Sequence, residues 1–241
     1  EFRRVLFRSA HPEILKRLAE TNMESLPGYG MDHYSESAKQ KIKRACGCQE
    51  AEVEFLVGGT QTNALIISTM LRDWEGVISA DNGHISVHES GAVEYGGHKV
   101  MVIPGKNGKL QAPDVRKLFK KFYDDVTRDH MVFPGMVYIS HPTEMGTIYS
   151  KAELEALSDI CHEYGIPLYL DGARLAYALA CPENDVGLPE LARLCDVFYV
   201  GGTKCGALCG EAVVVPEPSL LPGFFTIMKQ HGALMAKGRL S

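Results

Sequence analysis

The stretch VFYVGGTKCGALCG, residues 197–210, decides the fold and contains the most informative residue of the chain, Lys204. Its β-branched and aromatic start predicts a buried strand, and two glycines end that strand just before the lysine. A second apolar run, IPLYL at 166–170, ends in the same way at Asp171, with Arg174 three positions further on. The sequence therefore predicts an acid and a lysine, each delivered at the end of a strand.

Short apolar runs alternate with longer amphipathic runs along most of the chain. Strands are predicted at 53–57, 76–80, 98–103, 136–140, 167–171, 197–200 and 212–215, with helices at 60–72, 85–94, 113–123 and 151–164. This alternation is typical of an α/β fold, here an open and mostly parallel sheet sandwiched by helices. Ligands of such sheets bind beyond the carboxyl ends of the strands, so we expect Asp171, Lys204 and a glycine turn at 58–59 to meet at one edge.

Composition excludes several classes of function. The 241 residues carry a net charge of −5, which favours neither nucleic acid nor an anionic membrane surface as a partner. No apolar run approaches the roughly 20 residues that span a bilayer. The seven cysteines are scattered and lack zinc-site spacing, which indicates reduced thiols, a cytoplasmic location and no metal.

The sequence divides into four predicted parts. Residues 1–9 are basic and aromatic, unlike the rest, and we interpret them as a non-native segment. Residues 10–50 predict two helices, at 12–26 and 35–46, joined by a loop. Residues 51–225 form the predicted large domain. Residues 226–241 predict the start of a linker helix that leads toward a missing small C-terminal domain.

The acid and the lysine together indicate a pyridoxal phosphate (PLP) enzyme. In such enzymes a lysine forms a Schiff base with the cofactor aldehyde, and a carboxylate keeps the pyridine nitrogen protonated. Lys204 and Asp171 are the candidates for these two roles. There is an alternative if each residue is considered by itself. Lys204 would then be an ordinary solvent-exposed lysine, and Asp171 would cap a helix and be followed by a surface arginine.

The turn Gly58-Gly59-Thr60-Gln61 lies between a predicted strand and a helix. Free backbone N–H groups at such a helix start, together with the helix dipole, bind anions such as phosphate. The alternative is a tight turn in which Thr60 caps the helix. The segment matches neither the P-loop pattern nor the dinucleotide-binding glycine pattern.

His84 and His88 are four residues apart, after the strand that ends at position 80. This spacing suggests a metal site only weakly, because no acidic third ligand is placed beside the two histidines. We expect His84, close to the strand end, to lie over the face of a flat cofactor. His88 is interpreted as an ordinary helix histidine.

Seven motifs in order resemble the threonine aldolase and β-eliminating lyase family of fold-type I PLP enzymes. They are HPEIL at 11–15, GYGMD at 28–32, GGTQTN at 58–63, HI at 84–85, ESG at 89–91, DGAR at 171–174 and GTK at 202–204. The resemblance covers residues 10–241 and implies the large domain of a PLP-dependent transferase fold. It also assigns a role to each site residue: Lys204 carries the cofactor, Asp171 faces its ring nitrogen, His84 stacks on the ring, Gly59, Thr60 and Gln61 hold the phosphate, and Arg174 binds the substrate carboxylate.

The resemblance also implies a reaction. Its members cleave L-threonine or L-allo-threonine to glycine and an aldehyde, as homodimers or homotetramers. Many of them have a histidine near the substrate hydroxyl where this chain has Glu144, so the general base stays open between Glu144, His84 and a held water. The alternatives are β-elimination of an aromatic or sulfur-containing amino acid, and an inactive truncated fragment.

Overall fold

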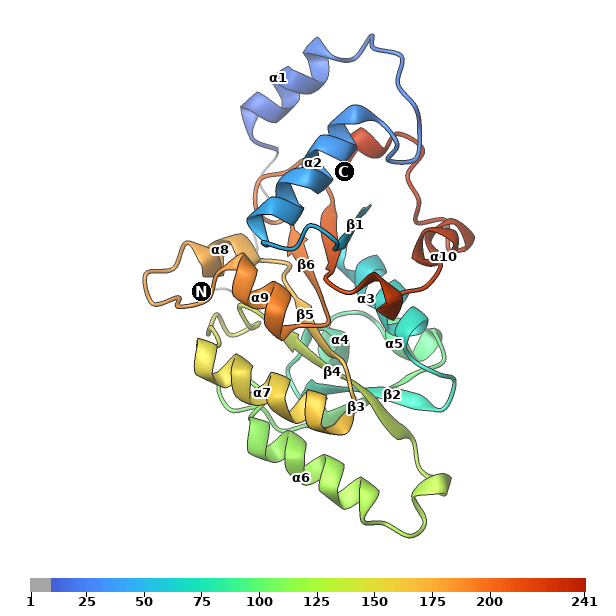
Figure 1. The fold of residues 1–241 in the computed structure, drawn as a ribbon, viewed down its shortest axis with the longest axis vertical. Coiled ribbons are helices and arrows are strands. Elements are labelled where there is room, and N and C mark those ends of the chain that lie inside the picture. The colour runs from blue at the N-terminus through green and yellow to red at the C-terminus, as the bar shows by residue number, and fades with distance from the viewer. Residues whose placement is uncertain (1–9) are drawn as a thin grey trace.

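The computed structural model describes residues 10–241, so the interpretation of residues 1–9 as a non-native segment lies outside the described part. A sheet of seven strands forms the centre, in the order β1-β7-β6-β5-β4-β2-β3 (Figure 1). The strands are β1 (Glu52–Leu56), β2 (Glu75–Ala80), β3 (Lys99–Ile103), β4 (Phe133–Ser140), β5 (Leu168–Asp171), β6 (Val197–Gly201) and β7 (Glu211–Val215).

Ten α-helices are described between and around these strands. They are α1 (Pro12–Glu20), α2 (His33–Ala45), α3 (Gly59–Met70), α4 (His84–Val87), α5 (Ala92–Tyr95), α6 (Ala112–Tyr123), α7 (Lys151–Tyr164), α8 (Leu175–Leu179), α9 (Leu188–Leu194) and α10 (Phe224–Gln230). Three short 3₁₀ helices cover Arg128–His130, Pro218–Leu220 and Gly238–Leu240. The α/β fold with a mostly parallel, helix-covered sheet is confirmed.

The strand registers place the strand ends that carry the predicted site residues at one edge of the sheet. Only β7 runs against its neighbours, because it pairs antiparallel with both β1 and β6. Glu211, the first residue of β7, lies opposite Leu56 on one side and Gly201 on the other. Ser140 at the end of β4 lies opposite Asp171 at the end of β5. The carboxyl ends of β1, β4, β5 and β6 thus share an edge, as ligand binding in such sheets requires.

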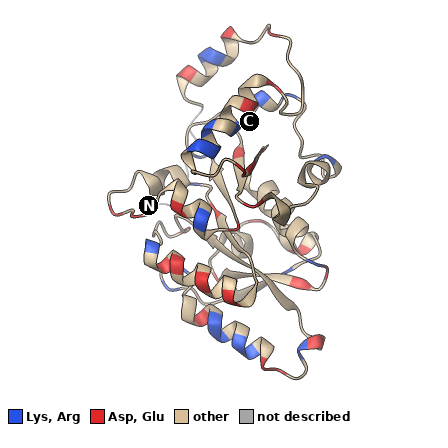
Figure 2. Cartoon of the chain, in the orientation of Figure 1, with Lys and Arg blue, Asp and Glu red and all other residues tan. Residues whose placement is uncertain are grey.

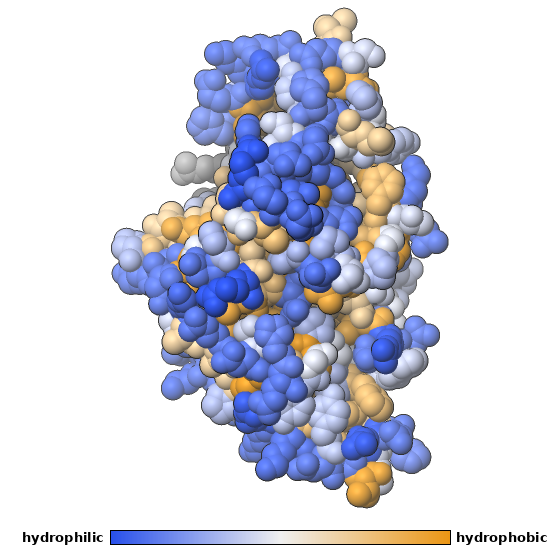
Figure 3. Space-filling view, viewed as in Figure 1, coloured by the Kyte–Doolittle hydropathy of each residue, from blue (hydrophilic) through white to orange (hydrophobic). Residues whose placement is uncertain are grey.

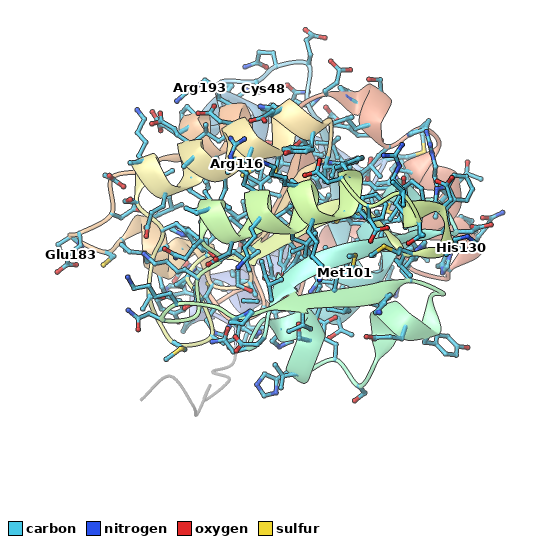
Figure 4. The ribbon with its side chains drawn as sticks, turned by 90° about the horizontal axis from the view of Figure 1, so that it is seen from below. Cys48, Met101, Arg116, His130, Glu183 and Arg193 are labelled. Atoms are coloured by element: carbon cyan, nitrogen blue, oxygen red, sulfur yellow. The ribbon has the colours of Figure 1, made fainter. Side chains whose placement is uncertain are left out.

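Each face of the sheet is covered by its own helices. Alternate residues of a strand point to opposite faces, so β5 sends Leu168 and Leu170 to one core and Tyr169 to the other. The first core lies under α6, α7 and α9, and the second lies under α3, α5 and α10 (Figure 1). Seen from below, α6 lies next to β3 (Figure 4). The labelled Arg116 belongs to α6, and the labelled Met101 belongs to β3.

Three predicted helices end differently in the structure. The helix predicted at 85–94 is two short helices, because Ser90 and Gly91 have positive φ of 52° and 72° and interrupt the hydrogen-bond ladder. The first helix stops at Glu20 rather than 26. The segment 226–241 is not one helix, since α10 ends at Gln230 and only a 3₁₀ turn follows.

The surface over α6 and α7 is charged. Basic residues concentrate on α6 and acidic residues on α7 (Figure 2), and Arg116 of α6 pairs with Glu163 of α7 at 2.7 Å. Hydrophilic side chains cover the outer faces of these helices and of α2 (Figure 3). Among residues 10–241, no helix has the length and apolar character needed to cross a bilayer.

Candidate active site

Asp171 is the centre of the site. Its side chain ends β5, and the residue is only 4% exposed. Oδ2 accepts hydrogen bonds from the Tyr138 hydroxyl at 2.6 Å and from Asn63 Nδ2 at 3.1 Å. Oδ1 accepts from the Tyr199 hydroxyl at 2.5 Å and from the Ala173 backbone N–H at 2.9 Å. Four donors thus fix the orientation of this buried carboxyl group.

The three tyrosines lie on one face of the sheet because alternate residues of a strand point to opposite faces. Tyr138, Tyr169 and Tyr199 all point to the α3 face, from three neighbouring parallel strands. Burial raises the pKa of all three phenols well above the ordinary value, with the charge of Asp171 as the next cause. The three hydroxyls therefore stay protonated and act as donors. Tyr169 donates to Asn63 Oδ1 at 2.7 Å, which orients the Asn63 amide toward Asp171.

His84 connects to the same network through a buried acid. Its Nδ1 lies 2.6 Å from Oε1 of Glu89, and that oxygen also accepts from Asn63 Nδ2 at 2.6 Å. The hydrogen bond to Glu89 raises the pKa of His84, with burial opposing it and the Asp171 charge adding to it. Within the described residues, the second oxygen of Glu89 is buried without a partner. His84, Asn63 and Asp171 thus form one continuous chain with Glu89.

Lys204 lies in the loop after β6, half-buried beside this network. Burial lowers the pKa of its amine, and the positive charge of Arg174 lowers it further. The negative charges of Asp171, Glu211 and Glu144 act in the opposite direction. Across residues 10–241, no hydrogen bond or ion pair of this amine is found, whereas the Lys204 carbonyl accepts from the Tyr177 hydroxyl at 3.1 Å. The Lys204 amine therefore lies close enough to Asp171 for the carboxylate to raise its pKa.

Two glycines let the ends of β5 and β6 approach closely. A Cβ on Gly201 would lie 2.4 Å from the carbonyl oxygen of Ala173. A Cβ on Gly172 would lie 1.9 Å from the carbonyl oxygen of Tyr199. Side chains cannot fit at either position, so the strand end that carries Asp171 and the loop that carries Lys204 are held in contact.

The N-terminus of α3 opens toward the same edge. Gly58 is its N-cap residue, and no side chain caps it, so the alternative in which Thr60 is the N-cap is wrong. The N–H groups of Gly59, Thr60 and Gln61 belong to the first turn and have no intrahelical acceptor. A Cβ on Gly59 would lie 3.0 Å from the Tyr199 hydroxyl, so this helix start adjoins the Asp171 network.

Glu144 follows β4 and reaches the site through Ser140. The Ser140 hydroxyl donates to Glu144 Oε1 at 2.8 Å and lies 3.2 Å from the Tyr138 hydroxyl. Within the described residues, Oε2 of Glu144 is buried and has no partner. Burial raises the pKa of Glu144, with the charge of Asp171 as the second cause and His84 opposing. Glu144 is therefore a half-buried acid at the edge of the site, with a raised pKa.

Arg174 and His88 lie at the ends of two short helices near the site. Arg174 precedes α8 as its N-cap residue, partly exposed, and its charge acts on Lys204. Asp171 is not the cap of that helix, so its alternative role as a helix cap is wrong. His88 follows α4 as its C-cap residue, with its ring centroid 5.7 Å from that of His84. In the described part of the chain, no group of histidines, cysteines and acids is arranged to hold a metal.

Residue type alone does not reveal the other members of the site. Asn63 and Glu89 lie inside recognisable motifs, but their partners are distant in sequence. The tyrosines read as ordinary core residues of apolar strands. Glu211 begins a strand and reads as a surface charge, yet it is only 4% exposed beside Lys204. The sequence could have indicated the position of Glu211 only in one way. If the strand after Lys204 is assumed to pair antiparallel with the strand before it, Glu211 lies opposite the glycines that precede Lys204.

The comparison with known families decides the affiliation of this constellation. The family model of the beta-eliminating lyases matches residues 9–240. The chain belongs to the beta-eliminating lyase family. A low specificity L-threonine aldolase of Pseudomonas aeruginosa is 32% identical over 233 residues, which make up 95% of this chain. The low specificity L-threonine aldolase of Saccharomyces cerevisiae is 28% identical over 190 residues, 77% of this chain and 47% of the relative.

Solved structures agree with this family. The Leishmania major threonine aldolase is 45% identical, with a TM-score of 0.94 over 99% of this chain and 69% of that one. An aspartate aminotransferase of Thermus thermophilus, 16% identical with a TM-score of 0.72, covers 97% of this chain and 63% of that one and shares the fold alone. This chain spans 65% of the length of the Pseudomonas relative. The predicted family resemblance is confirmed.

Proposed function

We propose that the enzyme containing this chain is a PLP-dependent aldehyde-lyase. It cleaves L-threonine or L-allo-threonine to glycine and an aldehyde. The observation that carries the proposal is Asp171, a buried carboxyl group with four donors, whose charge acts on the free amine of Lys204. The likeness to proteins named threonine aldolase, at 32% and 45% identity, supports the substrate class.

The donors and acceptors present fit PLP. The uncapped start of α3 suits a phosphate, held by the N–H groups of Gly59, Thr60 and Gln61. Asp171 suits a protonated ring nitrogen, and Lys204 the aldehyde carbon. The Asn63 contact with Asp171 is the longest of the four, and Asn63 keeps its shorter bond to Glu89 if a ring N–H takes its place. When bound, the cofactor supplies the electron sink that makes cleavage of the Cα–Cβ bond possible.

The remaining site residues would orient the substrate and move its proton. Arg174 offers a planar pair of N–H donors to the substrate carboxylate. Glu144, ionised, would take the β-hydroxyl proton on its free Oε2 and hold it as the neutral acid. His84 would lie over the cofactor ring, oriented by its bond to Glu89. In this arrangement Glu144 is the candidate base and His84 a positioning and stacking group.

Product analysis tests the proposal. The full-length enzyme with added PLP is given L-threonine, L-allo-threonine and an aromatic amino acid in separate reactions. We expect glycine and acetaldehyde from the first two substrates, and no product from a Lys204→Ala variant. Release of ammonia and a keto acid instead would establish the alternative, β-elimination. The 241-residue chain assayed alongside shows whether it is active or an inactive fragment.

We further propose that the complete enzyme is a homodimer or homotetramer located in the cytoplasm. The seven cysteines in the described residues are all free thiols, as expected of a reducing compartment. Light scattering of the full-length protein, with and without PLP, measures the oligomeric state.

A further inference from the structure

Glu211 is a buried acid for which the proposed reaction has no use. It starts β7, next to the edge where the cofactor would bind, and is 4% exposed. Its backbone lies opposite Gly201, the last residue of β6, and Lys204 follows three residues later. The carboxyl group is thus built into the strand that flanks the lysine loop.

Hydrogen bonds join Glu211 to that loop. Oε2 of Glu211 accepts from the Gly202 N–H at 3.2 Å, and the same N–H reaches the Gly210 carbonyl at 2.9 Å. Thr203 adds two contacts, one from its N–H to the Gly210 carbonyl at 3.2 Å and one from the Gly210 N–H to its hydroxyl at 3.0 Å. The two residues directly before Lys204 are therefore tied to the start of β7.

Glu211 and Lys204 also influence each other electrostatically. Burial raises the pKa of Glu211 to about 7, while Thr203, the Gly202 N–H and the charge of Lys204 lower it. In turn, Glu211 raises the pKa of Lys204, against burial and Arg174. The other titratable groups that act on one or both of them are Asp171, Glu144, His84, Tyr169, Cys205 and Cys209.

Asp171 already has four hydrogen-bond donors, and Glu144 is tied to Ser140. Glu211 is the acid that also contacts the lysine loop. We infer that Glu211 is a positioning residue that fixes the Lys204 loop from the start of β7 and adds, beside Asp171, to the negative charge near the Lys204 amine. The inference rests on the proposed function only in taking Lys204 as the reactive lysine. It goes further by assigning a second acid, distinct from Asp171, to the control of that amine.

Acetylation of Lys204 tests the inference without PLP. Acetic anhydride reacts only with the unprotonated amine, so the rate at Lys204, mapped by mass spectrometry across a pH series, gives the midpoint of its titration. In Glu211→Gln we expect the midpoint to fall and Lys204 to react several-fold faster below it. The rate on the alkaline plateau stays unchanged, whereas a mere gain in accessibility would raise the rate at every pH.

The matched control is Glu52→Gln, at the opposite end of the β1–β7 pair from Glu211, where Glu52 lies opposite Val215. Like Glu211, Glu52 has a pKa raised by burial, and its removal is expected to leave the Lys204 midpoint in place. If Glu211→Gln does not fold, Glu211→Asp keeps the charge and must retain the wild-type midpoint. An unchanged midpoint in folded Glu211→Gln, or a shifted one in Glu211→Asp, overturns the inference. Either result leaves the lyase proposal intact, because no PLP is involved.

Discussion

The hydroxyl of Tyr138 donates a hydrogen bond of 2.6 Å to Oδ2 of Asp171, across two neighbouring parallel strands. Tyr199 does the same to Oδ1 from the strand on the other side. Asp171 is therefore held between two phenols that burial keeps protonated. The orientation of the acid therefore depends on side chains that, from the sequence alone, look like ordinary hydrophobic core residues.

Removal of either phenol hydroxyl should destabilise the protein. We expect Tyr138→Phe and Tyr199→Phe each to lower the free energy of unfolding by about 1.5–3 kcal/mol, the range for a hydrogen bond to a charged group. Urea denaturation followed by circular dichroism measures this. Tyr123→Phe is the control, because in the described structure that hydroxyl makes no hydrogen bond and its residue is 36% exposed. We expect the control to change stability by less than about 0.5 kcal/mol. Equal effects in all three variants would contradict the account.

The close approach of β5 and β6 makes a second prediction. Gly201→Ala places a methyl group 2.4 Å from the carbonyl oxygen of Ala173, so backbone rather than a flexible side chain must shift to accommodate it. We expect a loss of about 3 kcal/mol of stability, at the upper end of the cost of overpacking. Gly58→Ala is the matched control, because its φ is −164° and nothing lies within 4 Å of the new Cβ. Thermal unfolding compares the two, and a Gly201→Ala protein as stable as Gly58→Ala would count against the close contact.

His141 predicts a dependence of stability on pH. Burial lowers the pKa of this residue from 6.5 to about 4, and its Nδ1 accepts from the Tyr149 N–H at 3.2 Å. Between these pH values the unfolded chain binds a proton that the folded chain does not, so stability falls as pH drops through this window. The drop amounts to about 3 kcal/mol. We expect His141→Asn, which keeps an acceptor for Tyr149, to remove this part of the acid loss in denaturation curves from pH 7 to pH 4. If the free energies of unfolding of variant and wild type differ by the same amount at every pH from 7 to 4, His141 is not a buried neutral histidine.

Glu144 makes a prediction about rate. If it takes the substrate hydroxyl proton, Glu144→Gln in the full-length enzyme lowers kcat for L-threonine by about 100-fold, the usual contribution of a general base. Because its pKa is raised, the acid limb of the wild-type kcat profile belongs to Glu144 and disappears in the variant. Glu94→Gln on α5 is the control, away from the hydrogen-bond network. Wild-type turnover in Glu144→Gln would leave His84 or a held water as the base.

The sequence predicts those parts of the site that lie at strand ends. Lys204 and Asp171 each follow an apolar run, and period-two patterning is enough to place them. The Gly58 turn is located in the same way. These local signals also predict the parallel sheet, because strand and helix patterns alternate regularly.

The rest depends on contacts between distant positions. Asn63 meets Glu89 and Asp171 only after three separate segments have packed, and no local pattern encodes that meeting. Ser90 and Gly91 split a helix that periodicity predicted as continuous, since a positive φ is not visible in hydrophobic spacing. Glu211 faces the lysine loop because β7 runs antiparallel, and the pairing partner of a strand is set by the whole sheet.

Borohydride reduction with PLP tests the central claim most directly. The protein is incubated with PLP, reduced, digested and mapped by mass spectrometry, with Lys204→Arg treated in parallel. We expect one phosphopyridoxyl group, on Lys204, and none on the variant. A folded wild-type protein that carries the group on another lysine, or on none, would contradict it.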